Sequence, residues 1–112
     1  MKVIHYSEIP ARKVNIEGAE GAAMRWLIAP TDNPPHFVMR MFEIQPGGHT
    51  PLHSHADEHE VFVLEGEGRV VLNEEEKPFS AGFAIYVPPE LKHQFKNTGS
   101  GLLRFLCLIP KG

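Results

Sequence analysis

The sequence lacks several features that would place it in common classes of protein. It contains one cysteine, Cys107, which excludes an internal disulfide framework and a cysteine-rich zinc site. No apolar run approaches the length of about 18 residues that a membrane-spanning helix needs, so we expect no contact with a membrane. The formal net charge of -3 provides no basic surface, and we therefore expect no binding to nucleic acid. The N-terminal segment lacks the apolar stretch and cleavage site of a secretory signal, which predicts a cytoplasmic protein.

Helical patterning is missing as well. No window of about 11 residues or more has the periodicity of an amphipathic helix, and 10 glycines and 10 prolines are spread along the 112 residues. Short runs between turn residues predict strands at 24–28, 36–44, 60–65, 69–73, 83–87, 93–96 and 102–109. We predict a turn at 45–48, a hairpin turn at 66–68 and a charged, solvated loop at 74–78. The pattern predicts a single all-β domain over residues 1–112, an antiparallel sandwich or barrel.

Histidine is abundant and concentrated in one stretch. Four of the seven histidines lie between His49 and His59. Side chains of an extended chain alternate between its two faces, so His53 and His55 point the same way and can bind one metal ion. The same alternation directs His59 inward and Glu60 to the opposite face, whereas a bulge after His55 would exchange the two. We therefore favour His59 as the third ligand and keep Glu60 as the alternative.

A fourth ligand from a distant strand would close the site across the barrel. His93, at the start of a predicted strand, is the candidate. A lone histidine is more often a packing or turn residue, and we interpret His5 and His36 in that way. His49 is predicted at the rim of the site. Four histidines at the spacings of the remaining set are difficult to explain by packing, and imidazole suits Zn, Fe, Ni and Cu, so we predict a metal site.

These residues resemble the two sequence motifs of the cupin superfamily. Residues in the spacing of the first motif are Gly47, His53, His55 and Gly66. His59 stands at the position that usually holds glutamate. Residues in the spacing of the second motif are Gly82, Pro88, His93 and Asn97, while Glu90 replaces its second glycine. The histidine at 59 resembles the small single-domain cupins in which four histidines hold the metal.

The resemblance implies a double-stranded β-helix, or jelly roll, with one divalent metal ion per chain. Its ligands would be His53, His55, His59 and His93. The resemblance favours Mn or Fe, while the Irving–Williams order means that Ni, Zn or Cu would also bind tightly. Four neutral imidazoles would leave the charge of the site at about +2, which attracts an anionic or enolisable oxygen ligand. Two positions of an octahedral site would stay open, for a chelating substrate or for substrate and dioxygen. A homodimer is also expected, with the segment 1–9 exchanged or paired between copies.

Further side chains are candidates for the pocket walls. Arg40 alternates with Phe42 on a predicted strand and could orient a carboxylate or an enolate. The last strand brings Phe105 and Cys107, and Glu60 could act as a base if it swings inward. The leading prediction is an oxidoreductase of dioxygenase type that acts on a small organic substrate. The alternatives are a non-redox isomerase or lyase acting on a sugar or keto acid, and a cupin that binds a small molecule without catalysis.

Overall fold

Strands make up most of the chain in the computed structural model, which describes residues 1–112. They are β1 (Arg12–Lys13), β2 (Glu20–Ile28), β3 (Phe37–His49), β4 (His59–Glu65), β5 (Glu67–Leu72), β6 (Glu75–Ser80), β7 (Ala84–Val87), β8 (His93–Asn97) and β9 (Leu103–Pro110). The other regular elements are two short 3-10 helices, η1 (Tyr6–Glu8) and η2 (Pro30–Asp32). Neither helix has the length and apolar character needed to cross a membrane. The predicted all-β class is confirmed.

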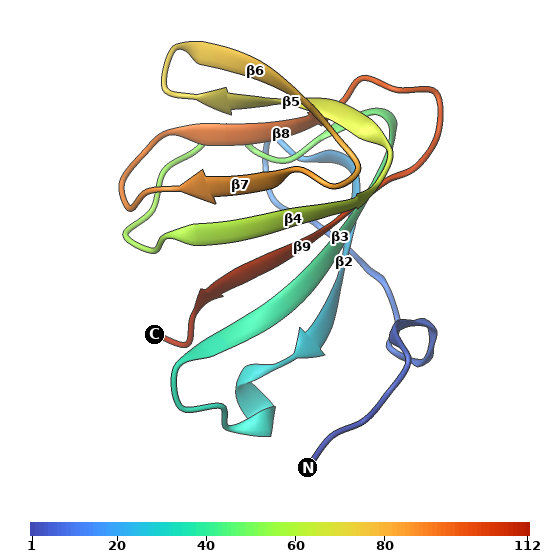
Figure 1. Cartoon of the computed structure of the whole chain (residues 1–112), viewed down its shortest axis with the longest axis vertical. Helices are drawn as coiled ribbons and strands as arrows, with labels where there is room; N and C mark the ends of the chain where they lie inside the picture. The colour runs from blue at the N-terminus through green and yellow to red at the C-terminus, as the bar shows by residue number, and fades with distance from the viewer.

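The strands form one antiparallel sheet that curls around the core. The order of its strands is β6-β5-β8-β3-β9-β4-β7, with β2 added to β3 and β1 to β2. The long strand β3 is central because it pairs with β2, β8 and β9. Figure 1 shows β5, β6 and β8 at one end of the molecule, while β2, β3 and β9 run from there toward the other end. This curled sheet is the jelly roll predicted from the sequence.

Alternation along the strands fills the interior. The buried positions of β4 are His59, Val61 and Val63, and the exposed positions between and after them are Glu60, Phe62, Leu64 and Glu65. On β9 the fully buried side chains are Leu103, Phe105 and Cys107. The inward direction of His59 that alternation predicts is therefore confirmed, and Glu60 lies on the outer face of the sheet.

Two predicted turns are wrong, because glycine lets the strands bend there instead. β3 continues through residues 45–48, with a register shift against β2. A Cβ atom on Gly48 would lie 2.6 Å from the carbonyl oxygen of Glu20, so only glycine fits this close approach. The hairpin predicted around 66–68 is absent, since β4 pairs with β7 and β9 whereas β5 pairs with β6 and β8. Gly66, with a φ of 91°, passes the chain directly from β4 to β5.

The solvated loop predicted at 74–78 is also wrong, because most of it is strand β6. β6 pairs only with β5 and so forms an edge of the sheet. Its residues Glu75, Glu76, Lys77 and Pro78 are exposed. Charged residues and proline are common on edge strands because they discourage pairing with another chain. The composition that suggested a loop therefore reflects the position of β6 in the sheet.

The N-terminal segment packs against the sheet without forming a strand of its own. Arg25 Nη1 donates hydrogen bonds to the backbone carbonyls of Tyr6 and Ile9. The ring of Tyr6 lies 5.5 Å from the guanidinium carbon of Arg25 and 5.0 Å from that of Arg104. The exchange of segment 1–9 in a homodimer concerns a second copy of the chain and stays a prediction.

Candidate metal centre

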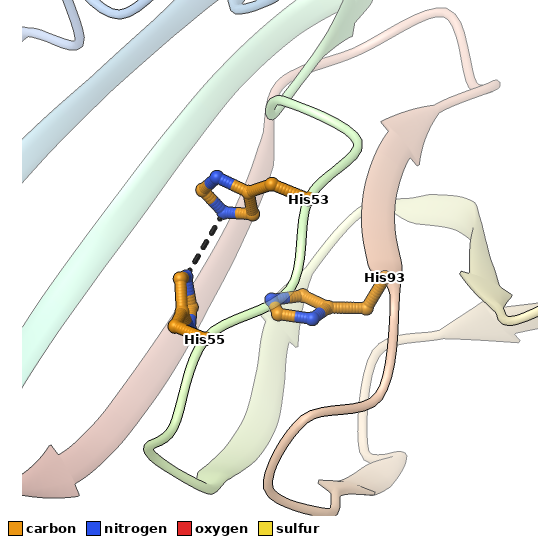
Figure 2. Close-up of side chains that lie close together, drawn as sticks. All are labelled: His53, His55 and His93. Atoms are coloured by element: carbon orange, nitrogen blue, oxygen red, sulfur yellow. Dashed lines mark hydrogen bonds between the residues drawn. The ribbon is translucent and has the colours of Figure 1, made fainter.

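Three histidines from two separate stretches of chain meet in the interior. His53 and His55 lie between β3 and β4, and His93 begins β8. One ring nitrogen of each residue lies within 4.8 Å of those of the other two. Nε2 of His53 and Nε2 of His55 are 3.0 Å apart, and Figure 2 shows the ring of His93 pointing from the start of β8 toward the stretch that carries His53 and His55. The structure thus brings His93 to the two neighbouring histidines across the barrel, as the sequence predicts.

Backbone hydrogen bonds join the two stretches. The N–H of His53 donates to the carbonyl of His93 over 3.2 Å, and the N–H of His93 donates to the carbonyl of His53 over 2.9 Å. Next to this bridge, the N–H of Phe95 donates to Oγ1 of Thr50 over 2.9 Å, and the N–H of Thr50 donates to the carbonyl of Phe95. The main chain alone therefore positions the Cα atoms of His53 and His93, independently of their rings.

The ring of His93 is held in one tautomer. Its Nδ1 lies 2.9 Å from the carbonyl oxygen of Leu91, and a carbonyl can only accept, so Nδ1 carries the proton. Nε2 is then the nitrogen with a free lone pair. A histidine that donates its other ring N–H to a carbonyl is the usual arrangement at protein metal sites.

His59 lies next to the group of His53, His55 and His93 but is not one of its members. Its Nε2 lies 3.1 Å from Nδ1 of His55, and its ring centroid is 4.8 Å from those of His55 and His93. On the other side of the ring, Nδ1 lies 3.2 Å from Sγ of Cys107 and 3.4 Å from Nη2 of Arg40. Three of the four predicted ligands thus form the compact group, and a role for His59 as the fourth stays a prediction.

The chemistry of these side chains fits a divalent metal ion. Burial lowers the pKa of His53 and His55, and neighbouring histidines lower it further. Burial, followed by the charges of His93 and Arg40, lowers the pKa of His59 to about 3. The rings of His53, His55 and His59 are therefore neutral at neutral pH, which is the form that binds metal. Two nitrogens that share one ion at about 2.1 Å lie at most about 4.2 Å apart, and the 3.0 Å between the His53 and His55 nitrogens is within this limit.

The histidines open onto a cavity of about 260 Å³. Its residues are Val14, Ile16, Arg40, Phe42, Thr50, Pro51, His53, His55, His59, His93, Phe95, Phe105 and Cys107. Three phenylalanines form one wall: Phe42 stacks on Phe105 with ring centroids 5.3 Å apart, and Phe95 is tilted against Phe105 at 4.8 Å. No carboxylate lines the cavity. It combines nitrogen donors with apolar walls, as small-molecule sites commonly do.

The candidate pocket residues differ in where the structure places them. Arg40, Phe105 and Cys107 line the cavity, whereas Glu60 does not. Burial raises the pKa of the Cys107 thiol, although the charge of Arg40 opposes this, so the sulfur is a neutral thiol at neutral pH. His49 also lies outside the lining, with its Nδ1 3.4 Å from Nε2 of Gln94.

Sequence reasoning missed several residues of the cavity. Thr50 lines it and also ties its stretch of chain to β8 through Phe95. Its position between two predicted site histidines is a signal that could have identified it. Val14 and Ile16 reach the cavity from the segment between β1 and β2. Nothing in the local sequence indicates this contact, because it depends on how the N-terminal segment crosses the sheet.

Comparisons with known proteins show one family and several functions. The family model described as the Cupin domain matches residues 40–109. The oxalate-binding protein of Thermotoga maritima is 33% identical over 113 residues, covering 96% of this chain and 92% of that protein. The structure of the polyketide cyclase RemF from Streptomyces resistomycificus has a TM-score of 0.93 at 35% identity, covering 100% of this chain and 80% of that one. A predicted oxalate decarboxylase from Thermotoga maritima has a TM-score of 0.87 at 27% identity, covering 97% and 98%.

The extent of these matches differs between relatives. The chain spans about half the length of two other curated relatives, 50% of one and 46% of the other. The proteins compared above are described as binding, cyclising or decarboxylating proteins. These similarities do not single out the dioxygenase reaction that is predicted from the sequence.

Proposed function

Since the chain belongs to the Cupin domain family, we propose that it is a metal-dependent cupin acting on a small, oxygen-rich organic molecule without a redox step. The observation that carries this proposal is the convergence of His53, His55 and His93 within 4.8 Å at an apolar-walled cavity. His59 is proposed as the fourth ligand, presenting Nε2 while its Nδ1 proton points at Cys107. Mn or Fe is the proposed ion, and Zn, Ni or Cu would bind the same nitrogens.

The chemistry follows from what surrounds the histidines. When bound, a divalent ion polarises an oxygen atom of the ligand as a Lewis acid. The histidines act only as ligands, the thiol of Cys107 is neutral, and no carboxylate is present to act as a base. The lining thus supplies no base, so the substrate must enter already ionised, as a keto acid or as the enolate of a 1,3-diketone that has lost its proton to solvent. Apolar walls formed by Phe42, Phe95 and Phe105 exclude water from such a substrate.

The comparisons favour this class over dioxygen chemistry. A polyketide cyclase acts on a chain of keto groups, and oxalate is a small oxygen-rich dianion, so both names fit a ligand of this kind. The thiol of Cys107 lies in the cavity wall, where an activated oxygen species would oxidise it. The dioxygenase prediction is kept as the outcome that the following experiment would reveal.

The protein will be loaded in turn with Zn, Mn and Fe and mixed with a panel of keto acids and 1,3-diketones. We expect turnover, or enolate formation monitored by hydrogen–deuterium exchange at the acidic carbon. Either should occur with Zn as well as with Mn or Fe. We expect no dioxygen consumption with any of the three metals. Consumption of dioxygen with Mn or Fe alone would replace this proposal by the dioxygenase, and binding without exchange would leave a binding protein.

Cys107 offers a separate test of the role of His59. Its sulfur lies 3.2 Å from both Nδ1 of His59 and Nη2 of Arg40, so both N–H groups can donate to it. We expect Cys107→Ala to lower metal affinity about 10-fold, because losing a partner of a metal-binding histidine costs about 10- to 100-fold. Cys107→Ser keeps an acceptor and should stay within about threefold of the wild type. Competition with a chelator measures both, and equal affinities for Ala and wild type would show that Cys107 does not support a metal-binding His59.

A further inference from the structure

Among the side chains of the cavity, Arg40 is the one whose charge the protein leaves unbalanced. We propose that Arg40 selects the ligand: its guanidinium binds a negatively charged oxygen, a carboxylate or an enolate, of a molecule whose other oxygen lies at the histidine group. This inference rests on the proposed metal-dependent function and adds to it the charge of the ligand. Three observations support it, namely the missing ion pair, the fixed position of the guanidinium and the size of the cavity.

The missing ion pair distinguishes Arg40 from the other half-buried arginines of the sheet. Arg25 and Arg104 both bind the carboxylate of Glu43, at 3.2 and 2.7 Å. Arg40 forms no ion pair in the chain, and its Nε is buried without a hydrogen-bond partner. Its Nη2 faces the thiol of Cys107 at 3.2 Å and the imidazole of His59. A half-buried guanidinium whose buried Nε has no acceptor and no carboxylate nearby is costly, which is expected if a bound anion completes the site.

The guanidinium is also held in place. Its carbon lies 4.9 Å from the ring centroid of Phe42 and 6.0 Å from that of Trp26, at distances typical of cation–π contacts. Nη1 has no hydrogen-bond partner in the protein and, unlike Nε, is not buried. Because Arg40 lines the cavity, Nη1 is the donor left for a ligand. A fixed donor next to the histidines provides two-point recognition of a compact molecule.

The size and walls of the cavity narrow the class of ligand. Its volume of about 260 Å³ is below the range of roughly 300–1,000 Å³ for drug-sized ligands. The phenylalanine wall favours a flat or apolar body over a sugar with many hydroxyl groups. A small keto acid, a dicarboxylate or the enolate end of a polyketone would each place one oxygen at the histidine group and a negatively charged oxygen at Arg40, with few other polar atoms.

The test compares Arg40→Met with the wild type, using Zn-loaded protein. Calorimetry will measure binding of oxalate and pyruvate, with pyruvamide as the neutral counterpart of pyruvate. We expect Arg40→Met to weaken binding of the two anions by about 10- to 100-fold, as the loss of a hydrogen bond to a charged group does. Binding of pyruvamide should change by less than about threefold, and Arg40→Lys should fall between wild type and Met. Arg69→Met, which removes a half-buried arginine that does not line the cavity, should bind like the wild type.

Metal affinity provides a second readout. If Arg40 had only a structural role, its replacement would not strengthen Zn binding. Removing a positive charge beside His59 should strengthen Zn binding in Arg40→Met, while anion binding weakens. The melting temperature of this variant should equal or exceed that of the wild type, because a half-buried charge without a counter-ion is removed. A lower melting temperature together with unchanged anion affinity would assign Arg40 a structural role.

The failures of the two proposals can be told apart. A wild-type protein that does not bind Zn would overturn the metal-dependent function and this inference with it. A wild-type protein that binds Zn but neither anion, or an Arg40→Met protein that binds Zn and both anions as well as the wild type does, would overturn the role of Arg40 alone. Arg40→Gln repeats the measurement with a polar side chain if the Met variant does not fold.

Discussion

Replacing His93 with alanine will lower the affinity of the protein for Zn or Mn by at least about 100-fold, more than the loss of an outer-shell partner causes. His93 is 4% exposed and is the one residue of the compact group that comes from β8. Its Nδ1 is engaged by Leu91, so Nε2 has one orientation toward the other two histidines. Without this ring only His53 and His55 remain in the group, and a site with too few nitrogens binds weakly.

The measurement is a titration of metal-free protein against a chelator of known affinity. Circular dichroism should show a folded variant, because the backbone bridge between residues 53 and 93 does not need the imidazole. His36→Ala is the matched control, since this histidine is exposed and outside the cavity. His59→Ala distinguishes a ligand set of four from one of three: a loss as large as that of His93→Ala indicates four. Wild-type affinity in the His93 variant would contradict the metal centre.

Replacing Glu43 with glutamine will destabilise the fold by about 2–4 kcal/mol, near the range for breaking a buried ion pair, with allowance for partial exposure of its partners. Glu43 is 8% exposed and accepts hydrogen bonds from Arg25 and from Nε of Arg104, at 3.2 and 2.9 Å. The neutral amide leaves two half-buried guanidinium groups without their shared counter-charge. Arg25 also holds the N-terminal segment, so this segment should loosen with it.

Urea unfolding of the two proteins measures this loss. Glu76→Gln is the matched control, because Glu76 also binds two cations, Arg69 and Lys96, but is 39% exposed. We expect a change of about 0–1 kcal/mol for this surface pair. Faster proteolysis within residues 1–11 of the Glu43 variant would report the loosened segment. Equal stability of Glu43→Gln and Glu76→Gln would show that the buried carboxylate does not stabilise the sheet.

The inward direction of His59 could be predicted because side-chain alternation in a strand has a fixed period of two residues, whereas His53 and His55 lie between β3 and β4. This rule placed His59 inside and Glu60 outside, and the resemblance to cupins brought His93 to His53. Strand pairing was less predictable, since a single glycine decides whether neighbouring strands form a hairpin. At Gly66 the chain passes directly from β4 to β5, whose partners are different strands. The local sequence contains no information about the partner that each strand meets.

Surface charge misled the prediction for a related reason. The run from Glu74 to Pro78 has the composition of a loop, yet most of it is an edge strand whose side chains face solvent. The unpaired state of Arg40 could not be predicted either. Alternation placed it beside Phe42 but could not show that Glu43, the next acidic residue, binds Arg25 and Arg104 instead.

The reciprocal main-chain hydrogen bonds between residues 53 and 93 affect how this protein would exchange metal ions. The intervening 39 residues (54 to 92) form a loop whose closure is already secured by amide hydrogen bonds. Capturing an ion then requires little further ordering of the chain, in contrast to zinc fingers, which fold only when loaded. On the proposed metal-dependent function, such a scaffold would release one ion and take up another without passing through the unfolded state. The kinetics of ligand dissociation and the composition of the surrounding ion pool would then govern exchange between metals.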